Sequence, residues 1–119
     1  MTPSAHTSPS RVTTHVLDTV RGAAAAGLAV TLEQHTMEGW LLLATGRTDA
    51  DGRVTDLGPA DLAPGRFRLS FDTGAWFAAA GESTFYPQVQ ITFEIRDAEA
   101  HYHVPLLLSP FAYSTYRGS

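Results

Sequence analysis

The chain has 119 residues, of which 44% are hydrophobic, and a formal net charge of −4. That length suits one domain and is short for two. The chain contains neither cysteine nor lysine, because all eight basic residues are arginine. Disulfides, thiolate chemistry, Schiff-base lysines and a P-loop lysine are therefore excluded. Polar chemistry must come from five histidines, eight arginines, twelve carboxylates and the hydroxyl groups.

Charge and hydropathy also limit the partners of the chain. A net charge of −4, with arginines spread along the sequence, provides no basic surface for nucleic acid. The longest apolar stretch, residues 22–30, is far shorter than the roughly 20 residues of a membrane helix. The N-terminal segment lacks the basic start and apolar core of a signal peptide. We therefore expect a cytoplasmic protein with a flexible arm over residues 1–10 and one domain over residues 11–119.

Alternation of apolar and polar residues predicts several strands. The pattern is found over residues 11–18, 28–34, 66–72, 88–96 and 101–108. In the first of these segments, Thr13, His15 and Leu17 share one face. A continuous apolar run over residues 40–45 predicts another strand, covered on both faces. Residues 21–27, between the first two alternating segments, are predicted as a loop because glycines flank four alanines.

One short helix is predicted over residues 72–80. Asp72 or Thr73 can cap its first turn, its alanines favour helix, and Gly81 can end it. Pro105 lies within the last alternating segment, which suits an edge strand or a residue whose N–H would point away from a partner strand. With a last short strand before the C-terminus, about seven or eight strands separated by turns predict an all-β antiparallel sandwich.

The histidines are the first candidates for chemistry. His101 and His103 share one face of a strand, and this spacing also occurs in metal sites, where His15 could supply a third imidazole. No acidic partner stands at a matching spacing, so a metal site is the weaker hypothesis. For His15 alone, a core histidine bonded to the backbone is the more common outcome. His6 and His35 are expected to be exposed, in the arm and in a loop.

Three segments together carry a resemblance to a known family. They read T-T-H-V-L-D-T at 13–19, T-D-A-D-G-R at 48–53 and H-Y-H-V-P-L-L-L-S-P at 101–110, and the chain ends in Y-R-G-S. In these motifs the sequence resembles the 5-hydroxyisourate hydrolases, the transthyretin-related enzymes of urate breakdown, over residues 11–119. The terminal Y-R-G-S is the most specific motif, because the hormone-carrier relatives lack it. Where the family usually has a proline after the first strand, this chain has four alanines at 23–26.

The resemblance implies a transthyretin-like sandwich of two four-stranded sheets with one short helix. It also implies a homotetramer, a dimer of dimers, with sites at the dimer–dimer interface. The implied substrate is a small purine-derived molecule, 5-hydroxyisourate, converted to 2-oxo-4-hydroxy-4-carboxy-5-ureidoimidazoline with no metal and no organic cofactor. The residues with implied catalytic roles are His15, Arg53, His103 and Ser119. Those implied to bind substrate are His15, Arg53, Tyr116, Arg117 and Gly118.

The residue types fit such a reaction. Adding water to a ring carbonyl and breaking the adjacent C–N bond needs a base, a stabiliser of the oxyanion and an acid for the leaving nitrogen. Our hypothesis is that His15 and His103 activate water and move the proton, assisted by the hydroxyl or carboxylate of Ser119. The planar guanidinium of Arg53 would face the substrate. Which histidine is the base stays open. Two other functions also stay open: a non-catalytic small-ligand carrier with the same fold, and a metal-dependent hydrolase using His15, His101 and His103.

Overall fold

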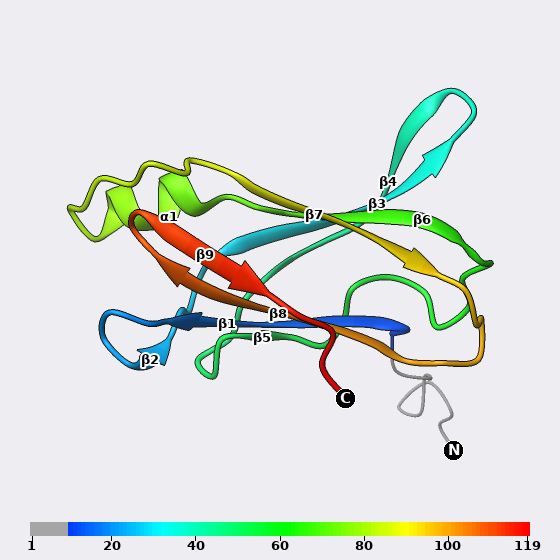
Figure 1. The fold of residues 1–119 in the computed structure, drawn as a ribbon, viewed down its shortest axis with the longest axis horizontal. Coiled ribbons are helices and arrows are strands. Elements are labelled where there is room, and N and C mark those ends of the chain that lie inside the picture. The colour runs from blue at the N-terminus through cyan, green and yellow to red at the C-terminus, as the bar shows by residue number, and fades with distance from the viewer. Residues whose placement is uncertain (1–9) are drawn as a thin grey trace, which may run out of the picture.

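The computed structural model describes residues 10–119, which form nine strands and one helix. In chain order these are β1 (Val12–Asp18), β2 (Ala23–Ala24), β3 (Ala29–Thr36), β4 (Gly39–Arg47), β5 (Arg53–Val54), β6 (Gly65–Phe71), α1 (Thr73–Ala79), β7 (Val89–Ile95), β8 (Tyr102–Ser109) and β9 (Ala112–Thr115) (Figure 1). The predicted arm lies outside the described residues except for Ser10. That residue is buried, and its hydroxyl donates to the Gly58 carbonyl at 2.9 Å. Ser10 therefore packs with the domain.

The strands form the two layers of a sandwich. One sheet has the order β4-β3-β6-β7, and the other has the order β2-β1-β8-β9 with β5 also paired to β1 (Figure 1). The predicted all-β sandwich with one short helix is confirmed. The second of these sheets, however, has five strands rather than the predicted four. The difference arises because the two-residue strands β2 and β5 share one edge of β1, while β8 occupies the other.

Residues 21–27, predicted as a loop, contain β2. Gly22 and Gly27 both adopt left-handed backbone conformations, with φ of 66° and 82°, so the chain can reverse tightly at each of them. The reversal places the two residues of β2 antiparallel to the last two residues of β1. The loop prediction is therefore wrong for these two alanines.

β1 and β8 pair in parallel, so the prediction of a purely antiparallel sandwich is wrong for this pair. The chain passes through the other sheet between them and then returns in the direction of β1. The register sets Thr13 opposite His103 and His15 opposite Pro105. β8 is an inner strand that pairs with β1 and β9. Its pairing with β9 covers Leu106 to Ser109 and does not reach Pro105. The prolyl nitrogen therefore stands outside that ladder.

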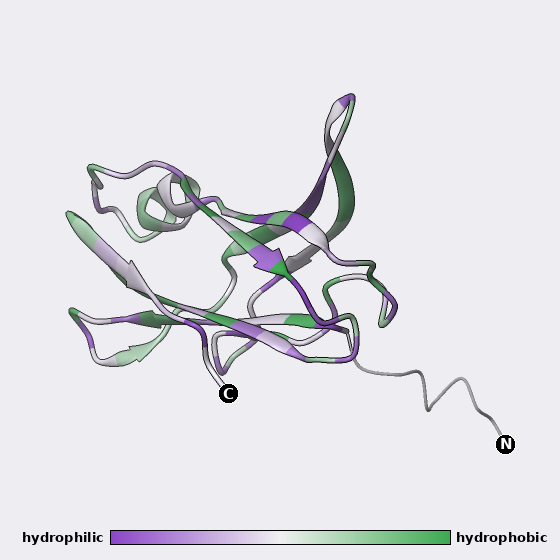
Figure 2. Cartoon of the chain, turned by 45° about the vertical axis from the view of Figure 1, so that its right-hand side comes forward, coloured by the Kyte–Doolittle hydropathy of each residue, from purple (hydrophilic) through white to green (hydrophobic). Residues whose placement is uncertain are grey.

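The core lies between the sheets and uses the apolar face of each alternating strand. On β6, Phe67, Leu69 and Phe71 are fully buried. On β7, buried or half-buried apolar residues alternate with exposed polar ones as predicted, and the same change of hydropathy is visible along the ribbon (Figure 2). Strand β7 therefore has an outer face available for polar side chains.

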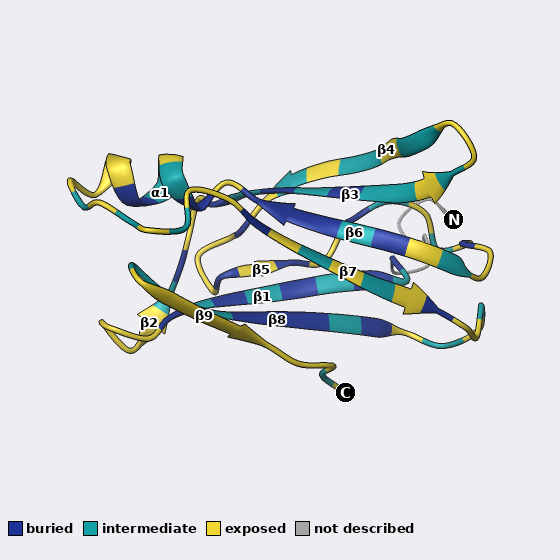
Figure 3. Ribbon diagram, turned by 45° about the horizontal axis from the view of Figure 1, so that its top comes forward, coloured by how far each residue is buried: buried dark blue, intermediate teal, exposed yellow. Residues whose placement is uncertain are grey.

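β4 departs from the prediction. The apolar run over residues 40–45 predicts a strand covered on both faces, yet Leu41 and Leu42 are 52% and 56% exposed. β4 is the edge strand of its sheet, and its outer surface carries exposed segments (Figure 3). The pairing register with β3 also shifts between Leu32 and Glu33. An apolar run alone does not distinguish an edge strand from a covered one.

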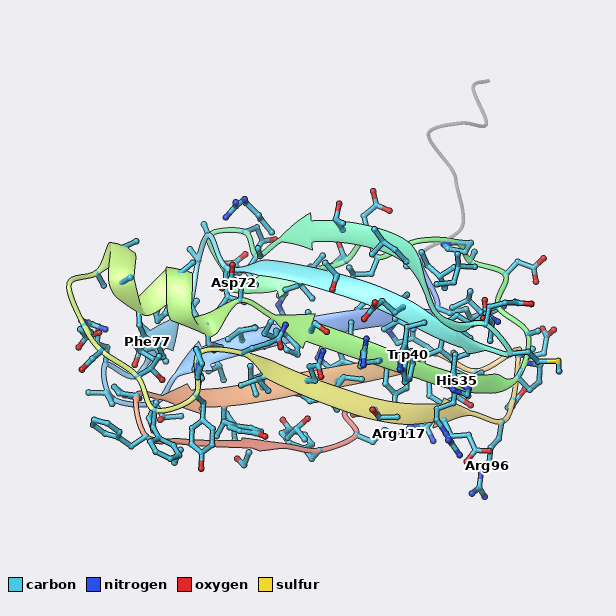
Figure 4. All side chains as sticks on the ribbon, turned by 90° about the horizontal axis from the view of Figure 1, so that it is seen from above. His35, Trp40, Asp72, Phe77, Arg96 and Arg117 are labelled. Atoms are coloured by element: carbon cyan, nitrogen blue, oxygen red, sulfur yellow. The ribbon has the colours of Figure 1, made fainter. Side chains whose placement is uncertain are left out.

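Helix α1 follows the prediction. Asp72 caps it by accepting a hydrogen bond from the Ala75 N–H at 3.3 Å, and Gly81, with φ of 74°, follows its end. Phe77 anchors the helix in the core (Figure 4). Within residues 10–119, no helix is long and apolar enough to cross a membrane.

Candidate active site

Strand alternation places three predicted site residues on the outer face of the five-stranded sheet. Along β1 the residues at even positions, such as Thr14, are buried, so His15 points to the opposite face. The parallel register brings β8 and His103 beside β1, and the antiparallel register of β5 sets Arg53 opposite His15. His15 is half-buried there, and its Nε2 lies 2.9 Å from the Asp51 carbonyl oxygen. His15 is therefore not a fully buried core histidine, although the bond to backbone is present.

The turn before β5 fixes the position of Arg53. Gly52 has φ of 77°, and a Cβ at this position would collide with the carbonyl oxygen of Val16, so the turn needs glycine. The carboxylate of Asp49 accepts hydrogen bonds from the backbone N–H groups of Arg53 and Asp51, at 3.0 and 2.9 Å. The bond from Arg53 is the main cause that lowers the pKa of Asp49. The turn thus fixes the backbone of Arg53 opposite His15 in the strand register.

His103 is the most perturbed histidine of the described chain. Its Nδ1 lies 2.7 Å from the hydroxyl oxygen of Thr13, and the same oxygen lies 2.9 Å from Nε2 of His101. Burial lowers the pKa of His103 below its usual range, and the charges of Arg53, His101 and His15 lower it further. The imidazole is therefore neutral at neutral pH and can accept a proton.

The C-terminal tail closes over His103. The Gly118 N–H donates to the His103 carbonyl at 2.8 Å. A Cβ at Gly118 would lie 2.6 Å from Cδ2 of His103 and 3.3 Å from Cγ of Pro105, so only glycine allows this approach. The contact brings Ser119 to an open cavity of about 310 Å³. The cavity is lined by Thr13, Thr14, Arg53, Thr55, His101, His103 and Ser119.

Tyr116 and Arg117 lie elsewhere in the single chain. Both line a second cavity, of about 170 Å³, between β7 and β8. The Arg117 guanidinium lies 4.5 Å from the ring centre of Tyr102, and its Nη2 donates to the His101 carbonyl at 3.4 Å (Figure 4). The structure therefore does not bring these two side chains to the cavity of His103, and their role in substrate binding stays a prediction.

The remaining histidines separate clearly from this site. The sequence predicts His35 in a loop, but it lies on β3; it is exposed, as expected, and its ring packs edge-on against Trp40, 5.0 Å between ring centres (Figure 4). His6 falls outside the described residues. Among the residues that the structure describes, no group of three or more histidine, aspartate or glutamate side chains has the arrangement of a metal site.

Sequence reasoning missed Thr13 as a site residue. Strand alternation places it on the face of His15, which was a usable signal. Only the parallel register of β1 and β8 shows that its hydroxyl stands between His101 and His103. Local sequence pattern carries no information about that register.

The fold and the site together define a transthyretin-like protein: a sandwich of two sheets with a polar cavity on the outer face of one sheet. Comparison with known proteins agrees. A 5-hydroxyisourate hydrolase from Salmonella dublin is 48% identical over 106 residues, which cover 88% of this chain and 78% of that protein. The structure of Klebsiella pneumoniae 5-hydroxyisourate hydrolase is 41% identical, with a TM-score of 0.81 over 91% of this chain and 98% of that one.

A transthyretin structure is also similar. The structure of sea bream transthyretin in complex with thyroxine is 33% identical, with a TM-score of 0.85 over 91% of this chain and 94% of that one. A family model described as the HIUase/Transthyretin family matches residues 12–118. The chain belongs to the HIUase/Transthyretin family.

Proposed function

We propose that this protein hydrolyses 5-hydroxyisourate, adding water to a ring carbonyl and breaking the adjacent C–N bond. The observation that carries the proposal is the convergence of Arg53, His103 and Ser119 on one cavity, with His15 opposite Arg53 in the strand register. The relatives from Salmonella dublin and Klebsiella pneumoniae carry the name of this activity.

Each group has a role that its surroundings support. His103, neutral because its pKa is lowered, takes the proton of the attacking water. The Arg53 guanidinium donates N–H groups to a carbonyl oxygen of the substrate and stabilises the oxyanion that forms there. His15 and the hydroxyl or carboxylate of Ser119 assist the proton transfer. No step needs a metal or an organic cofactor.

We also propose that the working form is a cytoplasmic homotetramer, a dimer of dimers with the cavities at the dimer–dimer interface. The side chain of Tyr116 is 58% exposed in the single chain. Assembly would enclose the open cavity, so that Tyr116 binds the substrate ring while Arg117 and Gly118 hold the tail.

A second candidate is a non-catalytic carrier, because sea bream transthyretin shares the fold and was solved with thyroxine. The lining of the cavity favours hydrolysis. The imidazoles of His101 and His103 and the guanidinium of Arg53 line this cavity. Sites that only bind small molecules are lined mostly by apolar side chains.

The test follows the ultraviolet decay of freshly generated 5-hydroxyisourate. The wild-type protein should accelerate this decay, and His103→Asn or deletion of Ser119 should lower kcat/KM by about 10²–10⁴-fold, as expected for the loss of a positioned acid–base group. His35→Asn is the matched control, since this histidine lies exposed on the other sheet, and it should keep full activity.

Three results would contradict the proposal. A wild-type protein that leaves the decay rate unchanged would be a carrier. Normal turnover by His103→Asn would remove this imidazole from the mechanism. Loss of activity on chelation, restored by metal, would favour the metal-dependent alternative that uses His15, His101 and His103.

A further inference from the structure

A hydroxyl joins the two histidines of the H-Y-H segment. Thr13 Oγ1 lies 2.9 Å from Nε2 of His101 and 2.7 Å from Nδ1 of His103. Thr13 on β1 and His103 on β8 are direct partners in the parallel register, and His101 lies just before β8. Backbone pairing therefore fixes two of the three residues, and His101 adjoins the paired segment. His101 is exposed at one end of the bridge, and His103 is half-buried at the other. Of these two histidines, the proposed mechanism uses only His103.

Counting hydrogens restricts how this bridge can be arranged. A threonine hydroxyl has one hydrogen to donate and two lone pairs to accept with. It cannot donate to both rings, so at least one imidazole must donate to it. If His103 is the base, its Nε2 must carry a lone pair, and its proton then sits on Nδ1 and is donated to Thr13. The Thr13 hydroxyl is then left to donate to Nε2 of His101.

The charges around His103 decide where an added proton is stable. The charged or titratable groups around His103 are Arg53 on β5, His15 on β1, His101 just before β8, and the chain terminus at Ser119 in the tail. Arg53, which is cationic, and His101, which can become cationic, border the same cavity as His103. The His103 ring is also half-buried. In the single chain His101 is exposed and His103 is half-buried, so a positive charge on His101 loses less hydration there.

We propose that Thr13 and His101 are positioning residues that fix the tautomer of His103 and share its proton during hydrolysis. As water attacks, its proton bonds to Nε2 of His103 and the hydroxide adds to the carbonyl carbon. The Nδ1 proton of His103 passes to Thr13 Oγ1, and the Thr13 hydroxyl proton passes to Nε2 of His101. One proton has then moved from water to His101, and no co-reactant is used.

The same bridge runs backwards in the second half of the reaction. His101 returns its Nε2 proton to Thr13, Thr13 returns one to Nδ1 of His103, and Nε2 of His103 gives its proton to the leaving nitrogen as the C–N bond breaks. This inference rests on the proposed hydrolysis for its kinetic consequences. The tautomer of His103 is a property of the folded protein alone.

The kinetic test uses Thr13→Val, which keeps the branched shape and removes the hydroxyl. Its kcat/KM should fall about 10- to 100-fold, by analogy with the loss of a partner that orients a metal-ligating histidine. Thr13→Ser should restore most of the rate, because it keeps the hydroxyl. His101→Gln, which can hydrogen-bond but cannot take up a proton, should lose rate as well. Thr31→Val, on the outer strand face of the other sheet, is the matched control.

The pH profile gives a readout that a merely structural change would not move. The pKa of His103 is lowered, so its base form persists below the ordinary histidine value near 6.5 and kcat/KM is lost only as pH falls further. Thr13→Val removes the acceptor of the Nδ1 proton and the route to His101. Both losses disfavour the charged ring, so the acid limb should move to lower pH, while Thr31→Val leaves it in place.

Nitrogen NMR of the histidine rings tests the arrangement without substrate. We expect His103 to carry its proton on Nδ1 in the wild type and in Thr13→Ser, and to lose that preference in Thr13→Val. A wild-type ring protonated on Nε2, or a Thr13→Val protein with unchanged rate and tautomer, would overturn the inference. If the wild type shows the expected tautomer but does not accelerate substrate decay, the proposed function fails and the positioning of His103 by Thr13 stands.

Discussion

At the scale of single residues, Gly118 shows how the tail controls the site. A Cβ at this position would lie 2.6 Å from Cδ2 of His103, and the ring cannot yield without leaving Thr13. We predict that Gly118→Ala displaces His103 and lowers kcat/KM by at least tenfold, a range that misplacement of a reacting group readily produces. Its melting temperature should change little, because the residue lies next to the end of the chain.

Gly81→Ala is the matched control for this glycine substitution. Nothing lies within 4 Å of a Cβ built at Gly81, but its φ of 74° strains any other residue. It should cost about 1 kcal/mol of unfolding free energy and leave kcat/KM unchanged. Equal activity of Gly118→Ala and wild type would show that the tail does not lie in close contact with the His103 ring in solution.

At the scale of elements, the single helix offers a test of what stabilises the fold apart from the site. Asp72 accepts a hydrogen bond from the Ala75 N–H and so satisfies one of the unpaired groups of the first turn. Asp72→Ala should lower the free energy of unfolding by about 0.5–2 kcal/mol, measured by denaturant at fixed protein concentration. Asp72→Asn keeps a capping oxygen and should lose much less.

The catalytic activity should not change when Asp72 is substituted. Asp72 lies at the start of α1, and the cavity is built from β1, β5, β8 and the tail. Both variants should therefore hydrolyse substrate at the wild-type rate. A loss of activity in Asp72→Ala that Asp72→Asn does not share would mean that the helix supports the site at a distance.

The alternation of apolar and polar residues predicts most of the strands, but it does not predict which strands pair or in which direction. Alternation identified β3, β6 and β7 with the correct buried faces, since one side of each strand must leave water. It did not reveal that β1 and β8 pair in parallel, because residues 12–18 and 102–108 contain nothing that encodes their register. It also did not reveal that β4 is an edge strand, which depends on what lies beside it.

The same limit applies to the site. Motif resemblance singled out His15, Arg53 and His103, and the structure places them on one sheet face. The bridge through Thr13 depends on the parallel register and so could not be predicted. The resemblance implies a substrate-binding role for Arg117, and this stays a prediction. In the single chain its guanidinium lies over the Tyr102 ring. In the proposed assembly, a second subunit would complete the site.

At the scale of the whole molecule, exposed aromatic side chains gather at one end of the sandwich. Phe85 and Phe111 are each 70% exposed, although the Phe85 N–H donates to the Pro110 carbonyl at 2.8 Å and ties the two loops together. Strand β9 is exposed along its whole length (Figure 3). Its Tyr113 packs edge-on against Tyr86, with 5.1 Å between the ring centres. Contiguous exposed aromatics of this kind mark interaction surfaces. They support the proposed assembly.

The assembly can be tested by mass and activity together. Light scattering should give the wild type four times the 12.8 kDa mass of the chain. Phe85→Glu should shift it to smaller species, because each buried phenylalanine contributes about 1.5–3 kcal/mol and an unpaired carboxylate in its place is costly. Activity should fall with the mass, since the cavity is open in one chain.

Met37→Glu is the matched control, because Met37 is fully exposed at the tip of the β3–β4 hairpin, on a different part of the surface. It introduces the same charge in place of an exposed apolar side chain and should change neither mass nor activity. A Phe85→Glu monomer that keeps wild-type kcat/KM would show that one chain holds the whole site. In that case Tyr116 and Arg117 would have no place in substrate binding, because a single chain directs both of them to the other cavity.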